Sequence, residues 1–321
     1  MTNRFSPGRR ESEAKTEPIP VIPAASPREG DRGVTIRPDL GPPAAGAQPV
    51  DQPGSGLGLI VAIAISAVVF VLAIYASGDA TPNPYPAFQT TNILFWFVAM
   101  LAIAGAGAGA QYAEITAARG SGVENRRGPD AYPTAWIVPS ISTFAAILLV
   151  ATFHNSVMLA IGPLVAFFGN AGALLARDLL DDTADASQRS ATTVHSLVVH
   201  VVAFVAFSAV YLNKFPTPIT AMLTGMIAAL LTLETLERAL APRAQRLTYA
   251  ALGGFVLGEA AVALNWWQTH GWVGGAVLLV AFYLASGILL AATQRNMTRT
   301  RDLFEYGLVG AVTIAILAIT A

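Results

Sequence analysis

Apolar residues come in long runs that begin after residue 56, separated by short polar stretches. Each run holds about 20 mostly apolar residues, enough to cross about 30 Å of hydrocarbon as an α-helix. The predicted spans are about 57–77, 91–113, 133–153, 157–176, 193–212, 218–238, 247–267, 273–293 and 303–320. The pattern predicts an all-α fold over residues 57–321, a polytopic membrane helical bundle of about nine transmembrane helices.

Composition agrees with a lipid environment. Hydrophobic residues make up 54% of the chain and charged residues 12%, whereas soluble domains carry about 25% charged residues. The net charge of −1 gives no electrostatic reason to expect nucleic acid. The absence of cysteine excludes disulfides, thiolate metal sites and cysteine nucleophiles, and the cofactor, if any, stays unknown.

Residues 1–56 differ from the rest of the chain. They hold many prolines, interleaved acidic and basic residues, and no periodic apolar pattern. Such a segment cannot bury enough apolar surface to offset its ordering entropy. We therefore expect a disordered, Pro-rich cytoplasmic tail, either inert or carrying a docking motif for a protein partner.

The charges of the connections predict the orientation. With nine spans, the connections on the same side as the tail hold eleven basic residues: Arg119, Arg126, Arg127, Arg177, Arg189, Arg238, Arg243, Arg246, Arg295, Arg299 and Arg301. The opposite connections hold only Lys214. By the positive-inside rule the tail is cytoplasmic and the C-terminus outside, in the cell membrane of a bacterial-type cell.

Small residues mark predicted helix contacts, and these faces could also receive a protein partner; a homo-oligomer is a separate alternative. One run is Gly105 to Ala110; another is a stripe formed by Ala251, Gly254, Gly258, Ala261 and Asn265. Glu259 lies beside this stripe. We therefore expect Glu259 to point into the bundle and its helix, 247–267, to be central.

A few polar groups lie within the predicted spans. The coupling candidates are Glu259, Glu234, His200, His195 and Asn265, with Glu305 in the last run. Intramembrane ionisable residues are costly and often functional, and histidine titrates near neutrality. If their helices adjoin, these groups would form a proton relay rising from the tail side. The alternative is purely structural hydrogen bonding between helices, with Glu234 paired to Arg238.

An acidic cluster follows the fourth span. Asp178, Asp181, Asp182 and Asp185 have the spacing at which carboxylates hold Mg²⁺ against a diphosphate. Over about eight residues this resembles the aspartate-rich motif of the intramembrane prenyltransferases, with Asp178, Asp181 and Asp185 at the matching positions. Arg177 replaces that motif's Asn, the second Asp cluster is missing, and the motif follows the fourth helix instead of the second. The alternative is a solvated acidic loop that opens the next helix.

The C-terminal third resembles an uncharacterised bacterial family of multi-pass membrane proteins. The resemblance rests on residues 233–238, 258–267, 282–283 and 305–307, including the sequence Gly258-Glu259-Ala260 and the pair Trp266-Trp267. It implies a polytopic helical fold and no activity.

Three function hypotheses follow. The first is a carrier or proton-linked transport protein with Glu259 as the coupling carboxyl. The second is a non-catalytic subunit or scaffold of a membrane complex. The third is a Mg²⁺-dependent prenyl or lipid transferase that uses Asp178, Asp181 and Asp185. The sequence assigns no catalytic residue outside this third hypothesis, and on balance it favours a protein that is not an enzyme.

Overall fold

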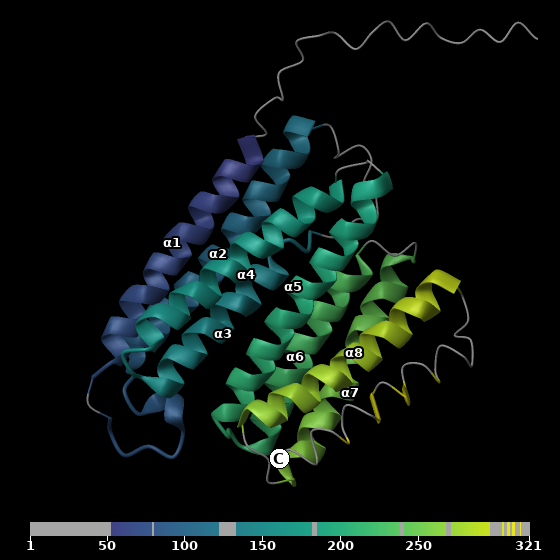
Figure 1. Ribbon diagram of the computed structural model, residues 1–321. Coiled ribbons are helices and arrows are strands. Elements are labelled where there is room, and N and C mark those ends of the chain that lie inside the picture. Colours follow the sequence, from purple (N-terminus) through teal and green to yellow (C-terminus); the bar gives the residue numbers. More distant parts are fainter. Residues whose placement is uncertain are drawn as a thin grey trace, which may run out of the picture. The chain divides into compact units, whose positions relative to one another are not determined.

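Eight α-helices and one short 3-10 helix make up the part of the chain that the computed structural model describes (Figure 1). It describes residues 53–78, 80–121, 133–181, 185–237, 241–267 and 271–295, and six helical positions between 304 and 315. The elements are α1 (Pro53–Ala76), η1 (Pro86–Phe88), α2 (Ile93–Ser121), α3 (Ile137–Phe153), α4 (Met158–Asp181), α5 (Asp185–Leu212), α6 (Thr217–Leu236), α7 (Arg243–Asn265) and α8 (Gly271–Arg295).

These helices lie over the first eight predicted spans. Seven of them are long and apolar enough to cross a membrane, and α3 is a shorter apolar helix. The chain is therefore a multi-pass, membrane-embedded helical protein. The described residues do not reach nine spans, because the predicted span 303–320 lies outside them except at the six helical positions. The predicted tail lies outside them up to residue 52.

The helices form one compact unit, which we divide in chain order into two groups of four, with α5 packing on both groups. In the first group α1 packs on α2, α3 and α4, and α3 also packs on α2 and α4. In the second, α6 packs along α7, and α8 packs on α5, α6 and α7. We call α1–α4 the N-half and α5–α8 the C-half. The boundary between them is formed by α3 and α4 against α5, and by α3 against α6.

Among the described helices, the central one is α3, not α7 as the sequence suggested. It contacts α1, α2, α4, α5, α6 and η1, and 14 of its 17 residues are buried. At 1.5 Å per residue it is about 25 Å long, and because protein surrounds it, it does not have to match the thickness of the lipid. In contrast, α7 packs mainly on α6 and α8.

The small-residue stripe on α7 forms a helix contact, as predicted. A Cβ on Gly254 would lie 2.6 Å from the carbonyl oxygen of Gly225 on α6, so the two backbones touch where both residues are glycine. This contact turns the adjacent face of α7 outward, and Glu259 is exposed. The expectation that Glu259 points into the bundle is therefore wrong. Because successive residues of a helix are rotated by about 100°, Glu259 points away from α6 although Gly258, in the stripe, faces it.

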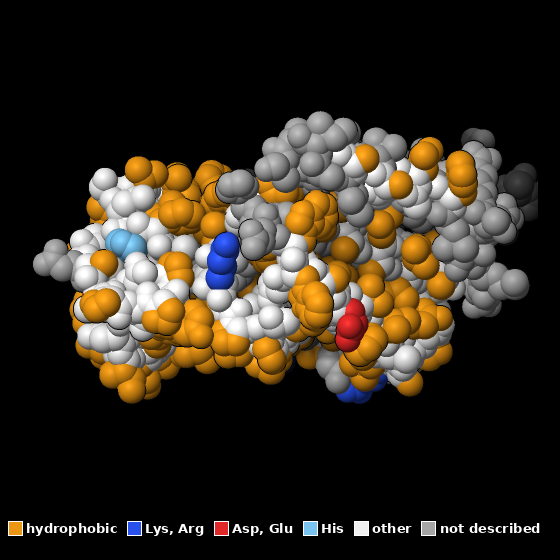
Figure 2. All heavy atoms as spheres, turned by 90° about the horizontal axis from the view of Figure 1, so that it is seen from below, with side chains coloured by type: hydrophobic (Ala, Val, Ile, Leu, Met, Phe, Trp, Pro, Cys, Tyr) orange, Lys and Arg blue, Asp and Glu red, His pale blue; other side chains and the backbone are white. Residues whose placement is uncertain are grey.

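A polar link crosses the boundary between the halves at the far side, which we define as the end opposite the start of α1. Asn213, which follows α5, is fully buried. Its amide donates to Thr152 Oγ1 of α3 (2.7 Å), and its carbonyl accepts the backbone N–H of Ala87 in η1 (2.9 Å). Figure 2 shows this end of the molecule, where hydrophobic side chains dominate and charged ones are sparse.

The contact between α6 and α7 predicts a strong penalty for a methyl group at Gly254. We expect Gly254→Ala to destabilise the protein by about 1–3 kcal/mol, because the Cβ meets backbone that cannot move aside. The matched control is Gly105→Ala, where the new Cβ would lie 3.7 Å from Ile65, an ordinary contact. Thermal unfolding in detergent measures both, and equal melting temperatures would contradict the α6–α7 packing.

Candidate functional site

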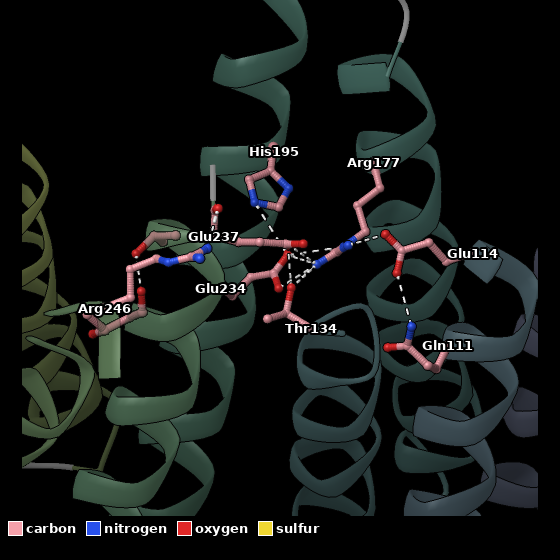
Figure 3. Close-up of polar contacts among 10 residues, drawn as sticks. Gln111, Glu114, Thr134, Arg177, His195, Glu234, Glu237 and Arg246 are labelled. Carbon is pink, nitrogen blue, oxygen red and sulfur yellow. Dashed lines mark hydrogen bonds and ion pairs between the residues drawn. The ribbon is translucent and has the colours of Figure 1, made fainter. Parts of the chain in front are cut away.

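The most densely charged site in the described residues surrounds Arg177, four residues before the end of α4 (Figure 3). It lies at the tail side, the end of the bundle at which α1 begins. Because successive helices run antiparallel, the ends of α2, α4 and α6 meet the starts of α5 and α7 at this end. We call its members the Arg177 cluster: Glu114, Thr134, Arg177, His195, Glu234, Glu237 and Arg246.

Arg177 binds carboxylates from both halves of the molecule. Its Nη1 lies 2.5 Å from Glu114 Oε1 on α2. Its Nη2 lies 2.7 Å from Glu234 Oε2 on α6 and 2.7 Å from Glu237 Oε2 at the end of α6, and Nε also donates to Glu234 (3.2 Å). The planar guanidinium has five donors in a fixed geometry, which suits several carboxylates at once in a way that a lysine ammonium does not.

Thr134 completes the coordination of the guanidinium. Its hydroxyl accepts a hydrogen bond from Arg177 Nη2 (2.5 Å) and donates one to Glu237. This residue precedes α3, so the cluster also fixes the segment that leads into the central helix.

Two further groups border the carboxylates. His195 Nε2 on α5 lies 3.6 Å from Glu234 Oε1, and Arg246 Nη1 on α7 donates to the backbone carbonyl of Glu237 (2.8 Å). The cluster thus collects side chains from α2, α4, α5, α6 and α7.

Burial makes these charges strong determinants of structure. Arg177 is 4% exposed and Glu234 2%. Desolvating an ion costs several kcal/mol, which is offset only when the pair is well aligned and its remaining hydrogen bonds are satisfied. The Arg177 guanidinium meets this condition through three carboxylates and a hydroxyl.

The structure joins some of the predicted site residues and separates others. His195 and Glu234 adjoin, as the relay hypothesis required, and Glu234 pairs with Arg177. The described contacts of His200 are with Ser196 (Nδ1 to backbone O, 2.7 Å) and with two rings of α8. Asn265 donates to Thr217 Oγ1 of α6 (3.2 Å). Glu259 has no hydrogen bond or ion pair with any described residue.

The predicted metal site lies largely outside the described side chains. Asp178 is half-buried in the last turn of α4, Asp181 ends that helix, Asp185 begins α5, and Asp182 is not described. Over the described part of the chain, no group of three or more His, Asp or Glu side chains is arranged to hold a metal ion.

Sequence reasoning missed five residues of the site: Glu114, Thr134, Arg177, Glu237 and Arg246. Arg177 and Arg246 were assigned to connections, whereas both lie inside helices and are buried. The available signal was that both arginines lie about one turn, and Glu114 about two turns, from helix ends that share the tail side.

The cluster predicts a large cost for removing the guanidinium that binds its three carboxylates. We expect Arg177→Met to lower the free energy of unfolding by about 3–5 kcal/mol, because it leaves buried carboxylates without their partner. Arg119→Met, at an exposed position on α2, is the control and should change it by less than about 0.5 kcal/mol. Thermal melting in detergent compares the two, and similar melting temperatures would show that the cluster does not hold the bundle together.

Comparison with known proteins agrees with the predicted family resemblance. The model of a family described as "Protein of unknown function (DUF5656)" matches residues 70–320, from the later part of α1 to the C-terminal end. No curated protein and no solved structure matches the chain significantly. The chain therefore belongs to the DUF5656 family of proteins of unknown function.

Proposed function

We propose that the protein is a proton-linked carrier in which the Arg177 cluster is the gate at the tail side. The observation that carries this proposal is that one buried guanidinium of the N-half binds two carboxylates of the C-half, Glu234 and Glu237.

A gate at this position suits the division into halves. Carriers expose a site alternately to the two sides of the membrane by moving one bundle against the other. Contacts that cross the boundary at one end must break when that end opens. Ion pairs can do so, because water that enters the opened end hydrates the separated charges.

The proton enters the proposal at Glu234. Arg177, Glu237 and Glu114 surround it on one side and His195 on the other, with Arg246 beyond Glu237. A proton on Glu234 removes one of the negative charges that hold the guanidinium and so weakens the link between the halves. In this mechanism the coupling carboxyl is Glu234 rather than Glu259, since Glu259 is exposed and lacks a described partner.

A cysteine reporter below the gate tests the mechanism, since the chain contains no cysteine. Val198 lies one turn deeper than His195 and faces α4, where a Cβ on Gly172 would lie 3.5 Å from it. In a Val198→Cys background, we expect Glu234→Gln to raise the rate of labelling by a membrane-impermeant maleimide on the tail side by at least about threefold. Each labelling rate is divided by the rate of the unfolded protein at the same pH. The normalised rate of the parent should rise as the pH falls, and that of Glu234→Gln should not depend on pH.

The matched control is Glu259→Gln in the same background, which makes the same chemical change away from the cluster and should leave labelling unchanged. If Glu234→Gln and Glu259→Gln label alike, the cluster is no gate. Proton uptake into vesicles that contain the purified protein then separates a carrier from a static bundle.

The orientation belongs to the same proposal: the tail side faces the cytoplasm. In intact cells, Lys214→Cys, at an exposed position on the far side, should react with an impermeant maleimide. Arg243→Cys, exposed at the start of α7, should react only after the membrane is permeabilised. The reverse pattern would place the basic connections outside and contradict the positive-inside assignment.

A further inference from the structure

The outward face of α7 carries a carboxyl in an apolar surface. Leu252, Phe255, Val256 and Trp266 are 48%, 66%, 44% and 86% exposed, and Glu259 and Ala263 lie exposed along the same stripe. At 1.5 Å per residue, Glu259 stands about 24 Å from the start of α7 and about 9 Å from its end. It therefore lies within the apolar length of the helix and not in a connection.

The other described glutamates, which lie nearer the tail side, all have a basic partner. Glu114, Glu234 and Glu237 are all paired with Arg177. Glu259 has no hydrogen bond, ion pair or ring contact with any described residue. An acid in hydrocarbon requires a hydrogen-bonding partner or a water-filled surrounding, and the described part of this chain supplies no partner.

We infer that a second copy of this chain covers this face, with the two α7 helices parallel and Glu259 opposite Glu259 across a two-fold axis normal to the membrane. A two-fold axis in this direction places identical residues at the same depth. A protonated carboxyl both donates and accepts, so two Glu259 side chains complement each other. No described Lys or Arg lies at this depth: Lys214 is in the α5–α6 connection, and the arginines lie at the tail side.

This interface is independent of the Arg177 gate. It involves a face of the C-half that does not border the N-half, and none of its residues belongs to the cluster. The dimer can therefore be tested whether or not the protein proves to be a carrier.

Cysteine cross-linking in the native membrane locates the interface. We expect Val256→Cys, one turn from Glu259, to form a disulfide-linked dimer with mild oxidant, because facing positions bring the Cα atoms within about 7 Å. The matched control is Leu101→Cys on α2. Leu101 is 57% exposed, and its distance from the far-side end of α2 is similar to the distance of Val256 from the far-side end of α7. Cross-linking from Leu101→Cys alone, or from both positions equally, would overturn the proposed interface.

The role of the carboxyl is tested by counting subunits of the labelled protein in phosphatidylcholine vesicles by single-molecule photobleaching over a dilution series. Glu259→Leu should weaken dimerisation about tenfold, because leucine cannot hydrogen-bond between helices. Glu259→Gln should stay within about threefold of the parent, because an amide also donates and accepts. Monomers at every dilution, or an equally strong Glu259→Leu dimer, would overturn the inference. A Val256→Cys cross-link to a different protein, with no homodimer, would also overturn the inference, because it would assign this face to a heterologous partner.

Discussion

The structure depends on the burial of one guanidinium. Arg177 is only 4% exposed, and protein groups from α2, α6 and the segment that enters α3 accept its hydrogen bonds. Each acceptor is itself a buried acid or hydroxyl that would be costly without Arg177. The set is therefore interdependent, and a change in the position of any one helix would leave a charge unpaired.

At the opposite end, Asn213 does the same with neutral groups, since it links the end of α5 to α3 and η1. Between these two links the boundary of the halves is formed largely by apolar and small side chains of α3, α4 and α5. Apolar contacts inside a membrane hold helices by close packing and give little directional preference. The two polar links therefore fix the relative depth of the N-half and C-half. The link at the tail side is thus charged and the link at the far side is neutral.

The sequence predicts the positions and order of the described helices because a membrane-length apolar run is a one-dimensional signal. It fails where the answer depends on which faces meet. The glycines of α7 correctly predicted a helix contact, but they also suggested that α7 was the central helix. That position belongs to α3, whose short span and even apolar character gave no sequence signal for it. Arg177 and Arg246 were counted as connection residues because an arginine near the end of an apolar run is compatible with both a solvated loop and a buried pair. Only their three-dimensional neighbours, Glu114 and Glu237 among them, distinguish the two.

Glu234 and Glu259, the two glutamates of the C-half that the sequence analysis selected, have opposite surroundings. We therefore assign Glu234 to the proposed conformational change and Glu259 to the proposed dimer. Glu234 is enclosed by partners from its own chain, so in the proposed carrier its protonation would act on the boundary between the halves. Glu259 lies on an outward face, so in the proposed dimer its partner would come from a second chain. A dimer through α7 would join two C-halves into one unit. The N-half, attached to that unit at α3 and α4 and by the Arg177 and Asn213 links, would then be the part free to move once protonation weakens the charged link.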